Sequence, residues 1–191
     1  MHQNFERLLA NHCAPLLFGK KPAILLAKKN FPKNYELGLL WQYGFRELRL
    51  YRAKGQALIF LYHPALLKEA VSNPITVQTL SEMGYSYTDG LIGLLAFLRR
   101  RFMESSEFPH EVGFFLGYPA EDVVGFLSCN DHCKLCGQWK VCSDVERATI
   151  LFDEYSRCKQ TLLNHIEKGT SIFSIITPIS AGENYKEAHL C

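Results

Sequence analysis

The sequence predicts an α+β fold in which about four strands form a mixed sheet, with one antiparallel hairpin and one βαβ unit, packed against several helices. Three observations predict it. Residues 45–64 have the pattern of two paired strands, residues 112–142 alternate strand, helix and strand, and residues 143–169 form one long amphipathic helical pattern. We expect a single domain over residues 1–191, with a partly ordered C-terminal extension at 170–191.

The first 44 residues favour short elements. Asn4 can cap a helix that runs to His12, because the apolar residues of this segment share one helical face. Residues 13–34 contain three prolines and a glycine, which favour short helical turns and loop. A second helix is expected from Asn34 to Gly44, where a glycine can end it.

The strand pair has the sequence FRELRLYRAKGQALIFLYHP. Leu48 and Leu50 alternate with charged neighbours, as in a strand with one buried face, and the turn falls at residues 53–55. The second strand, ALIFLY, is apolar throughout, so we expect it to be the central strand of the sheet.

Three helices should follow the hairpin. Pro64 and Pro74 suit the first turns of two of them, and Asn73 can cap the second. Asp89 precedes a third helix, with the apolar sequence LIGLLAFL.

The βαβ unit is expected between residues 112 and 142. A strand at about Val112–Leu116, a helix beginning at Pro119 and a strand in GQWKVC would make a right-handed parallel crossover. The last helix begins with the capping-box spacing of Ser143 and Glu146, and its apolar stripe ends at Gly169. We expect this helix to lie on the sheet.

Composition and charge exclude several classes of protein. Of the 191 residues, 48% are hydrophobic, and 21 basic against 19 acidic residues leave a net charge of +2. This composition is not that of a disordered chain, and the charge is too small to attract nucleic acid or an anionic membrane. No apolar run reaches the roughly 18 residues of a membrane span, and MHQNFERLL carries acid and amide side chains where a signal peptide would be apolar, so we expect no secretory signal. We expect a cytoplasmic protein that binds neither nucleic acid nor membrane; a homo-oligomer is left open.

Seven cysteines without a secretory signal favour free thiols or a metal site over a disulfide framework. Cys129, Cys133 and Cys136 have C-x3-C-x2-C spacing, and His132 or Cys142 could supply a fourth ligand. Thiolates and imidazole within one loop suit zinc or iron. Ordinary thiols with no metal are the alternative.

Cys13 and His110 are candidates for catalysis. A thiol becomes a nucleophile beside a base such as histidine, which Asp122 or Asp144 could orient. The structural alternative is a buried Cys13 that packs as a small apolar residue and a His110 that bonds the backbone.

Lys20 and Lys21 follow a glycine and, with Lys140, could bind a small acidic ligand. The segment lacks the full G-x-x-x-x-G-K-[ST] pattern, so we do not expect a nucleoside triphosphatase. Solvated lysines are the alternative.

Four segments carry a resemblance to a known family: CAPLLFGKKPA, LIFLYHPALL, FPHEVGFFLGYPAEDVVGF and CGQWKVCSDVERATILFDEYSRC. In this order they resemble the Domain of Unknown Function 3793 family of anaerobic Gram-positive bacteria. The resemblance implies a single cytoplasmic domain and marks Cys13, His110 and residues 117–119 and 139–141 as family-pattern positions, but it implies no activity. Members usually read Trp-Lys-Val-Tyr-Gly-Asp where this chain has Trp-Lys-Val-Cys-Ser-Asp, and the cysteines at 129–136 look like a feature of this member.

We therefore expect a small-ligand or cofactor-binding domain, linked by its cysteines and by the anaerobic resemblance to redox or metal homeostasis. Its site would lie where the hairpin end, the His110 strand and the Cys13 loop meet, since sites favour loops at strand ends. A thiol-dependent enzyme with Cys13 and His110 is one alternative, and an interaction subunit with an exposed apolar SIFSII tail is another. The expected ligand-binding residues are Lys20, Lys21, Glu111, Tyr118 and Lys140.

Overall fold

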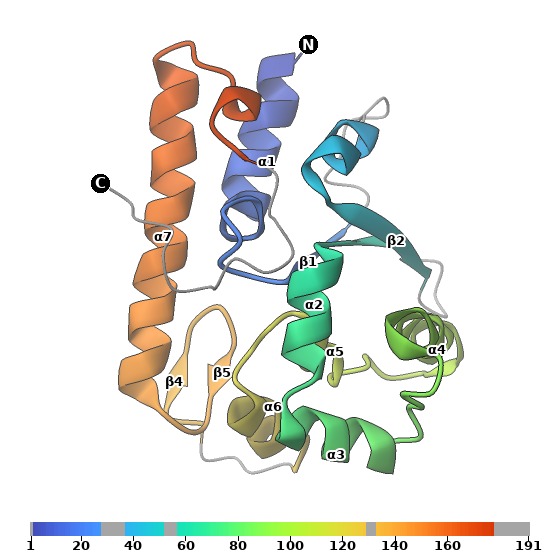
Figure 1. Ribbon diagram of the computed structural model, residues 1–191. Coiled ribbons are helices and arrows are strands. Elements are labelled where there is room, and N and C mark those ends of the chain that lie inside the picture. Colours follow the sequence, from blue (N-terminus) through green and yellow to red (C-terminus); the bar gives the residue numbers. More distant parts are fainter. Residues whose placement is uncertain (1, 28–36, 52–56, 129–132, 178–191) are drawn as a thin grey trace.

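A computed structural model describes residues 2–27, 37–51, 57–128 and 133–177 (Figure 1). At its centre, three antiparallel strands lie in the order β1–β3–β2. Their bounds are β1 Ala23–Ala27, β2 Arg46–Tyr51 and β3 Ala57–Tyr62. The predicted hairpin and the central place of its second strand are confirmed.

The two faces of the sheet belong to two hydrophobic cores. Ile24, Leu26, Ile59 and Leu61 point to one core, which also contains the apolar faces of α1 (His2–Leu17) and α7 (Val145–Glu167). The alternate positions, Phe60 among them, point to the second core under the other helices. Because β3 is covered on both faces, its sequence is apolar throughout.

The second core is covered by five helices, which occupy the lower part of Figure 1. They are α2 (Pro64–Val71), α3 (Pro74–Glu82), α4 (Gly90–Glu104), α5 (Val112–Phe115) and α6 (Ala120–Leu127). Pro64 and Pro74 occupy first turns, and the Asn73 side chain accepts hydrogen bonds from two backbone N–H groups, as predicted.

The short elements complete the described chain. They are η2 (Leu37–Tyr43), β4 (Leu135–Cys136), β5 (Lys140–Val141) and η3 (Ile172–Ser174). Strands β4 and β5 form a separate hairpin that packs on the first half of α7 through a small third core.

The prediction of a four-stranded mixed sheet with a βαβ unit is wrong. The segment Val112–Phe115 is the helix α5, and Lys140–Val141 pairs with β4 in its own hairpin. Val112 to Leu116 are all buried, and a short apolar run buried on every side has no period that separates strand from helix. The described sheets are therefore antiparallel.

The expectation of turns and loop after His12 is also wrong. Helix α1 continues through Pro15 to Leu17, and β1 follows at Ala23. Pro15 lies in the last turn of α1, so the one helical hydrogen bond that its missing N–H removes falls near the end of the helix. The buried Leu16 and Leu17 stabilise this turn against α7.

Helix α7 packs mainly against α1, and it meets the sheet only through the core that they share. Its N-cap is Asp144, which accepts a hydrogen bond from the Arg147 backbone N–H. The predicted C-terminal extension begins as a packed segment, since Ile172 is buried and its N–H donates to Glu6 at 2.8 Å. None of the helices in the described ranges has the length and apolar composition to cross a bilayer.

Candidate ligand-binding site

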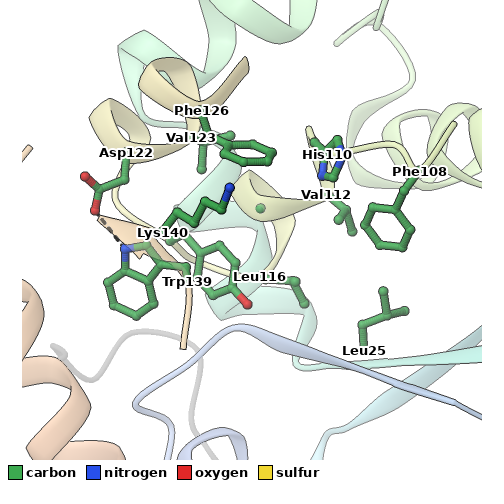
Figure 2. Close-up of a pocket in the computed structure, with 12 residues that line it drawn as sticks. Leu25, Phe108, His110, Val112, Leu116, Asp122, Val123, Phe126, Trp139 and Lys140 are labelled. Carbon is green, nitrogen blue, oxygen red and sulfur yellow. Dashed lines mark hydrogen bonds between the residues drawn. The ribbon is translucent and has the colours of Figure 1, made fainter. Parts of the chain in front are cut away.

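A hollow of about 360 Å³ opens between β1, α5, α6 and the β4–β5 hairpin (Figure 2). These elements are far apart in sequence, and the second core brings them together. Much of the wall is apolar, and its apolar side chains include Leu25, Phe108, Val112, Leu116, Val123 and Phe126.

A glycine turn fixes this part of the wall to the sheet. Gly117 has φ +74°, which favours glycine, and a Cβ atom there would overlap the Pro22 ring. The close approach of Gly117 to Pro22 anchors the α5–α6 connection beside β1. Tyr118 is thereby placed on the wall of the hollow.

Asp122 connects α6 to the hairpin through four hydrogen bonds. Its Oδ2 accepts from Trp139 Nε1 at 2.7 Å, and its Oδ1 accepts from the Cys142 backbone N–H at 2.8 Å. The backbone N–H and the hydroxyl of Ser143 both donate to Oδ1 at 2.7 Å. Burial alone would raise the pKa of this carboxyl, but the hydrogen bonds outweigh it and lower the pKa of Asp122. The buried carboxylate therefore holds β5 against the hollow.

Tyr118 and Trp139 form a stacked aromatic pair on the wall of the hollow. Their rings stack with centroids 5.0 Å apart and an interplanar angle of 24°. Behind them, the Lys21 ammonium lies 4.8 Å from the Tyr118 ring centroid and 5.7 Å from that of Tyr155. Burial lowers the pKa of Lys21 to about 8. Lys21, a predicted ligand-binding residue, lies behind the wall and lines neither hollow.

Lys140 and His110 carry the polar groups of the hollow that are available to a ligand. The Lys140 ammonium lies 5.1 Å from the Phe126 ring centroid, and the His110 ring lies edge-on to the same ring at 4.8 Å. Both side chains are exposed, and Figure 2 shows both at the hollow. Within the described parts of the chain, neither has a hydrogen bond or an ion pair from its side chain. They were predicted to form part of a site, and the structure brings them together.

A larger hollow of about 720 Å³ adjoins the first one. The two share Phe108, His110, Phe126 and Lys140, so these four side chains form the boundary between them. The larger hollow has a more polar wall, with charged side chains from α4, from the segment before α5 and from the hairpin, together with Cys133 and Cys136.

Cys13 is buried and does not reach either hollow. It lies on α1 with no exposed surface, in the core shared with α7, and burial raises the pKa of its thiol. Cys13 lines neither hollow, and no hydrogen bond joins it to His110 in the described structure. The two predicted catalytic residues are thus not brought together.

Two other predicted ligand-binding residues have partners inside the protein. The buried Glu111 carboxylate accepts from Arg101 Nε at 2.8 Å and from the Tyr85 hydroxyl at 3.2 Å. Lys20 Nζ lies 2.9 Å from Glu154 Oε1 on α7. Both charged side chains therefore form ion pairs inside the protein, which is a structural role.

The predicted metal site is described in part. Cys129 and His132 lie outside the described residues, Cys136 is exposed on β4, and Cys133 Sγ lies 2.8 Å from Cys142 Sγ. Burial, the hydrogen bond with Cys133 and nearby negative charges raise the pKa of Cys142 to about 11. Among the residues that the structure describes, no three His, Cys, Asp or Glu side chains gather as a metal-ligand set. The zinc or iron site stays a prediction.

Sequence reasoning missed the role of Asp122 and the aromatic residues Phe108 and Phe126. The Asp122 partners are 17 to 21 residues further along the chain, on a different element. A carboxylate in the otherwise apolar segment DVVGFL was the available signal, because a buried charge needs several donors.

Comparison with known proteins gives one match. The family model described as "Protein of unknown function (DUF3793)" matches residues 9–176, most of the chain. No curated protein and no solved structure matches the chain.

Proposed function

Because the chain belongs to DUF3793, a family described as of unknown function, we propose a function from the geometry of the smaller hollow. The protein binds a small molecule that has an apolar, aromatic body and an acidic group. The body occupies the space between the apolar wall and the Tyr118–Trp139 stack. The acidic group lies between Lys140 and His110.

The observation that carries this proposal is a cation that, among the described residues, has no counterion and lies beside an apolar hollow. The carboxylate that lines the hollow, Asp122, accepts from four neutral donors, and within the described residues it forms no ion pair with Lys140. The Lys140 ammonium contacts an aromatic face, and His110 presents its ring to the same space. Charge-assisted hydrogen bonds to an anion are the strong polar contacts that this arrangement can make.

The size and shape of the hollow support the same ligand class. Its volume of about 360 Å³ is that of a small-molecule site. Four aromatic side chains, Phe108, Tyr118, Phe126 and Trp139, line the hollow, and aromatic rings favour offset stacking or edge-to-face contact with one another. An aromatic acid matches both the wall and the charge.

Localisation and biological context rest on other grounds. A cytoplasmic location, and a link to anaerobic redox or metal homeostasis, follow from the cysteine content and from the resemblance to the family. They stay predictions.

The proposal can be tested with two fluorescent probes that differ by one acidic group. Anilinonaphthalene sulfonate has an aromatic body and a sulfonate, whereas phenylnaphthylamine has the same body without the charge. We expect both probes to bind the full chain with one saturable site, and the sulfonate to bind more tightly.

Two variants separate the cavity from the charge. Leu25→Phe should fill the hollow and weaken both probes, whereas Lys140→Met should weaken the sulfonate about fivefold, or about 1 kcal/mol, and leave the neutral probe unchanged. Lys159→Met, which removes an exposed lysine on α7, is the matched charge control. Unsaturable binding, or a sulfonate affinity that Lys140→Met and Lys159→Met reduce equally, contradicts the proposal.

A further inference from the structure

Cys133 and Cys142 bring two thiols together beside the β4–β5 hairpin. Their Sγ atoms are 2.8 Å apart, and both cysteines are free and half-buried. Bonded sulfur atoms lie about 2.0 Å apart, so a shift of less than about 1 Å would join them. The two cysteines are nine residues apart in the chain. Cys133 lies just before β4, and Cys142 lies just after β5.

The backbone beside each sulfur is held by hydrogen bonds. Just before β4, the Lys134 N–H donates to the Val141 carbonyl at 2.8 Å, and Lys134 Nζ donates to the Ser143 carbonyl at 2.8 Å. Just after β5, the Cys142 N–H donates to the buried Asp122 carboxylate. The two thiols are therefore kept close by the fold and not by a covalent bond between them.

Solvent and a small molecule can reach one thiol of this pair. Cys133 lines the larger hollow, together with Lys134 and Lys140, whereas Cys142 does not line it. The attacking sulfur in exchange with a disulfide must be within reach of the substrate. Access thus distinguishes Cys133 as the attacking sulfur and Cys142 as the one that resolves the intermediate.

We propose that Cys133 and Cys142 are a redox-active dithiol that reduces small disulfides bound in the larger hollow. The Cys133 thiolate attacks one sulfur of the substrate disulfide, the substrate S–S bond breaks, and the first thiol product leaves with a proton. Cys142 loses its proton and attacks Cys133 Sγ, which releases the second thiol. Two electrons pass from the dithiol to the substrate, and the protein keeps a Cys133–Cys142 disulfide. This activity goes beyond the ligand site proposed above and does not depend on it.

The test uses the full chain, reduced and kept free of oxygen, with one molar equivalent of dithiobis(nitrobenzoate), a disulfide whose thiolate product is coloured. We expect two coloured thiolates per protein, loss of two hydrogens from the protein mass, and a peptide map that joins Cys133 to Cys142. Cys142→Ser should release one thiolate and retain the other as an adduct on Cys133. Cys133→Ser should slow the first release at least about tenfold.

Cys136→Ser is the matched control, because Cys136 lines the same hollow and is exposed. It should leave the two-thiolate release unchanged. Circular dichroism of each variant checks that the fold is retained. Three outcomes overturn the proposal: a peptide map that joins Cys133 to another cysteine, a stable adduct on the wild-type chain, or a native mass with one zinc ion per chain that blocks exchange.

Discussion

Cys13 and Cys158 lie in the α1–α7 core, whereas Cys133 and Cys142 flank the β4–β5 hairpin, and the two pairs differ in exposure. Cys13 and Cys158 have no exposed surface, and burial raises the pKa of both thiols, that of Cys158 to about 11. Cys133 and Cys142 are half-buried and lie in contact. The difference shows that the number of cysteines says little about reactivity, which depends on access and on a neighbouring thiol or charge.

The same two regions differ in how they are stabilised. The α1–α7 core is held by apolar packing, with long side chains from α1, the sheet and α7. The hairpin has a small core and depends on Asp122, whose carboxylate gathers donors from three residues. Removal of a hydrogen-bonding side chain should therefore destabilise the hairpin most. Replacement of a buried apolar side chain by a polar one should destabilise the core most.

The largest effect is expected from Asp122→Ala. The change leaves the indole N–H of Trp139 and the backbone N–H groups of Cys142 and Ser143 without their acceptor in a buried place. We expect the free energy of unfolding at pH 7 to fall by about 3 to 4 kcal/mol, measured by urea denaturation. Asp153→Ala, which removes an exposed carboxylate from α7, should change it by less than about 0.5 kcal/mol.

The pH dependence gives a second readout of this prediction. The pKa of Asp122 is lower in the folded chain than in the unfolded chain, so its stabilisation is complete above the ordinary aspartate pKa. It is lost as the pH falls through the lower folded value. The difference between wild type and Asp122→Ala should therefore shrink in acid, and a difference that is constant down to pH 2 would contradict this assignment.

Local signals explain the parts of the fold that the sequence predicts. Prolines mark the starts of α2 and α3, and Asn73 caps α3. The β2–β3 hairpin is identified by the alternation of apolar and charged residues in β2 and by the apolar sequence of β3. The register of α7 is equally local, because its apolar stripe repeats over 23 residues. Each of these features is encoded within a few turns of chain.

Long-range contacts explain the parts that the sequence does not predict. The apolar segment of α5 becomes a helix inside the second core, and the last turn of α1 passes Pro15 because α7 covers it. In the site, His110, Tyr118 and Lys140 were identifiable as residue types, but the Asp122–Trp139 bond and the Cys133–Cys142 contact depend on the packing of α6 and the hairpin.

A middle-sized effect is expected in the α1–α7 core from Cys13→Ser. A serine hydroxyl replaces the thiol of a side chain that is surrounded by apolar groups. We expect the free energy of unfolding to fall by about 2 kcal/mol in urea denaturation. Cys136→Ser, at an exposed position, should fall within about 0.5 kcal/mol of wild type.

Alkylation rates sharpen this comparison between buried and exposed thiols. In the native chain, Cys13 should react with iodoacetamide only through unfolding, so its rate should rise steeply with urea. Labelling of Cys13 as fast as that of Cys136 in the absence of urea would show that the core is open to solvent, contrary to its zero exposure.

The smallest effect tests two neighbouring lysines where the two regions meet. Lys21 is 7% exposed, and its lowered pKa of about 8 indicates an unfavourable burial of charge. The contacts with the Tyr118 and Tyr155 rings offset part of that cost. Lys21→Met should therefore stabilise the protein by about 1 kcal/mol at pH 7 in urea denaturation. Lys20→Met is the matched control, because it removes the ion pair with Glu154 and should destabilise by about 0.5 kcal/mol.

The sign of the pH dependence identifies the cause of this gain. The folded chain releases the Lys21 proton near pH 8, whereas the unfolded chain keeps it until about pH 10.5, so wild-type stability rises with pH between these values. The advantage of Lys21→Met should be constant below pH 8 and should decrease above it. An advantage that persists unchanged at pH 10 would mean that methionine gains through packing, and that the buried ammonium of Lys21 costs the fold little.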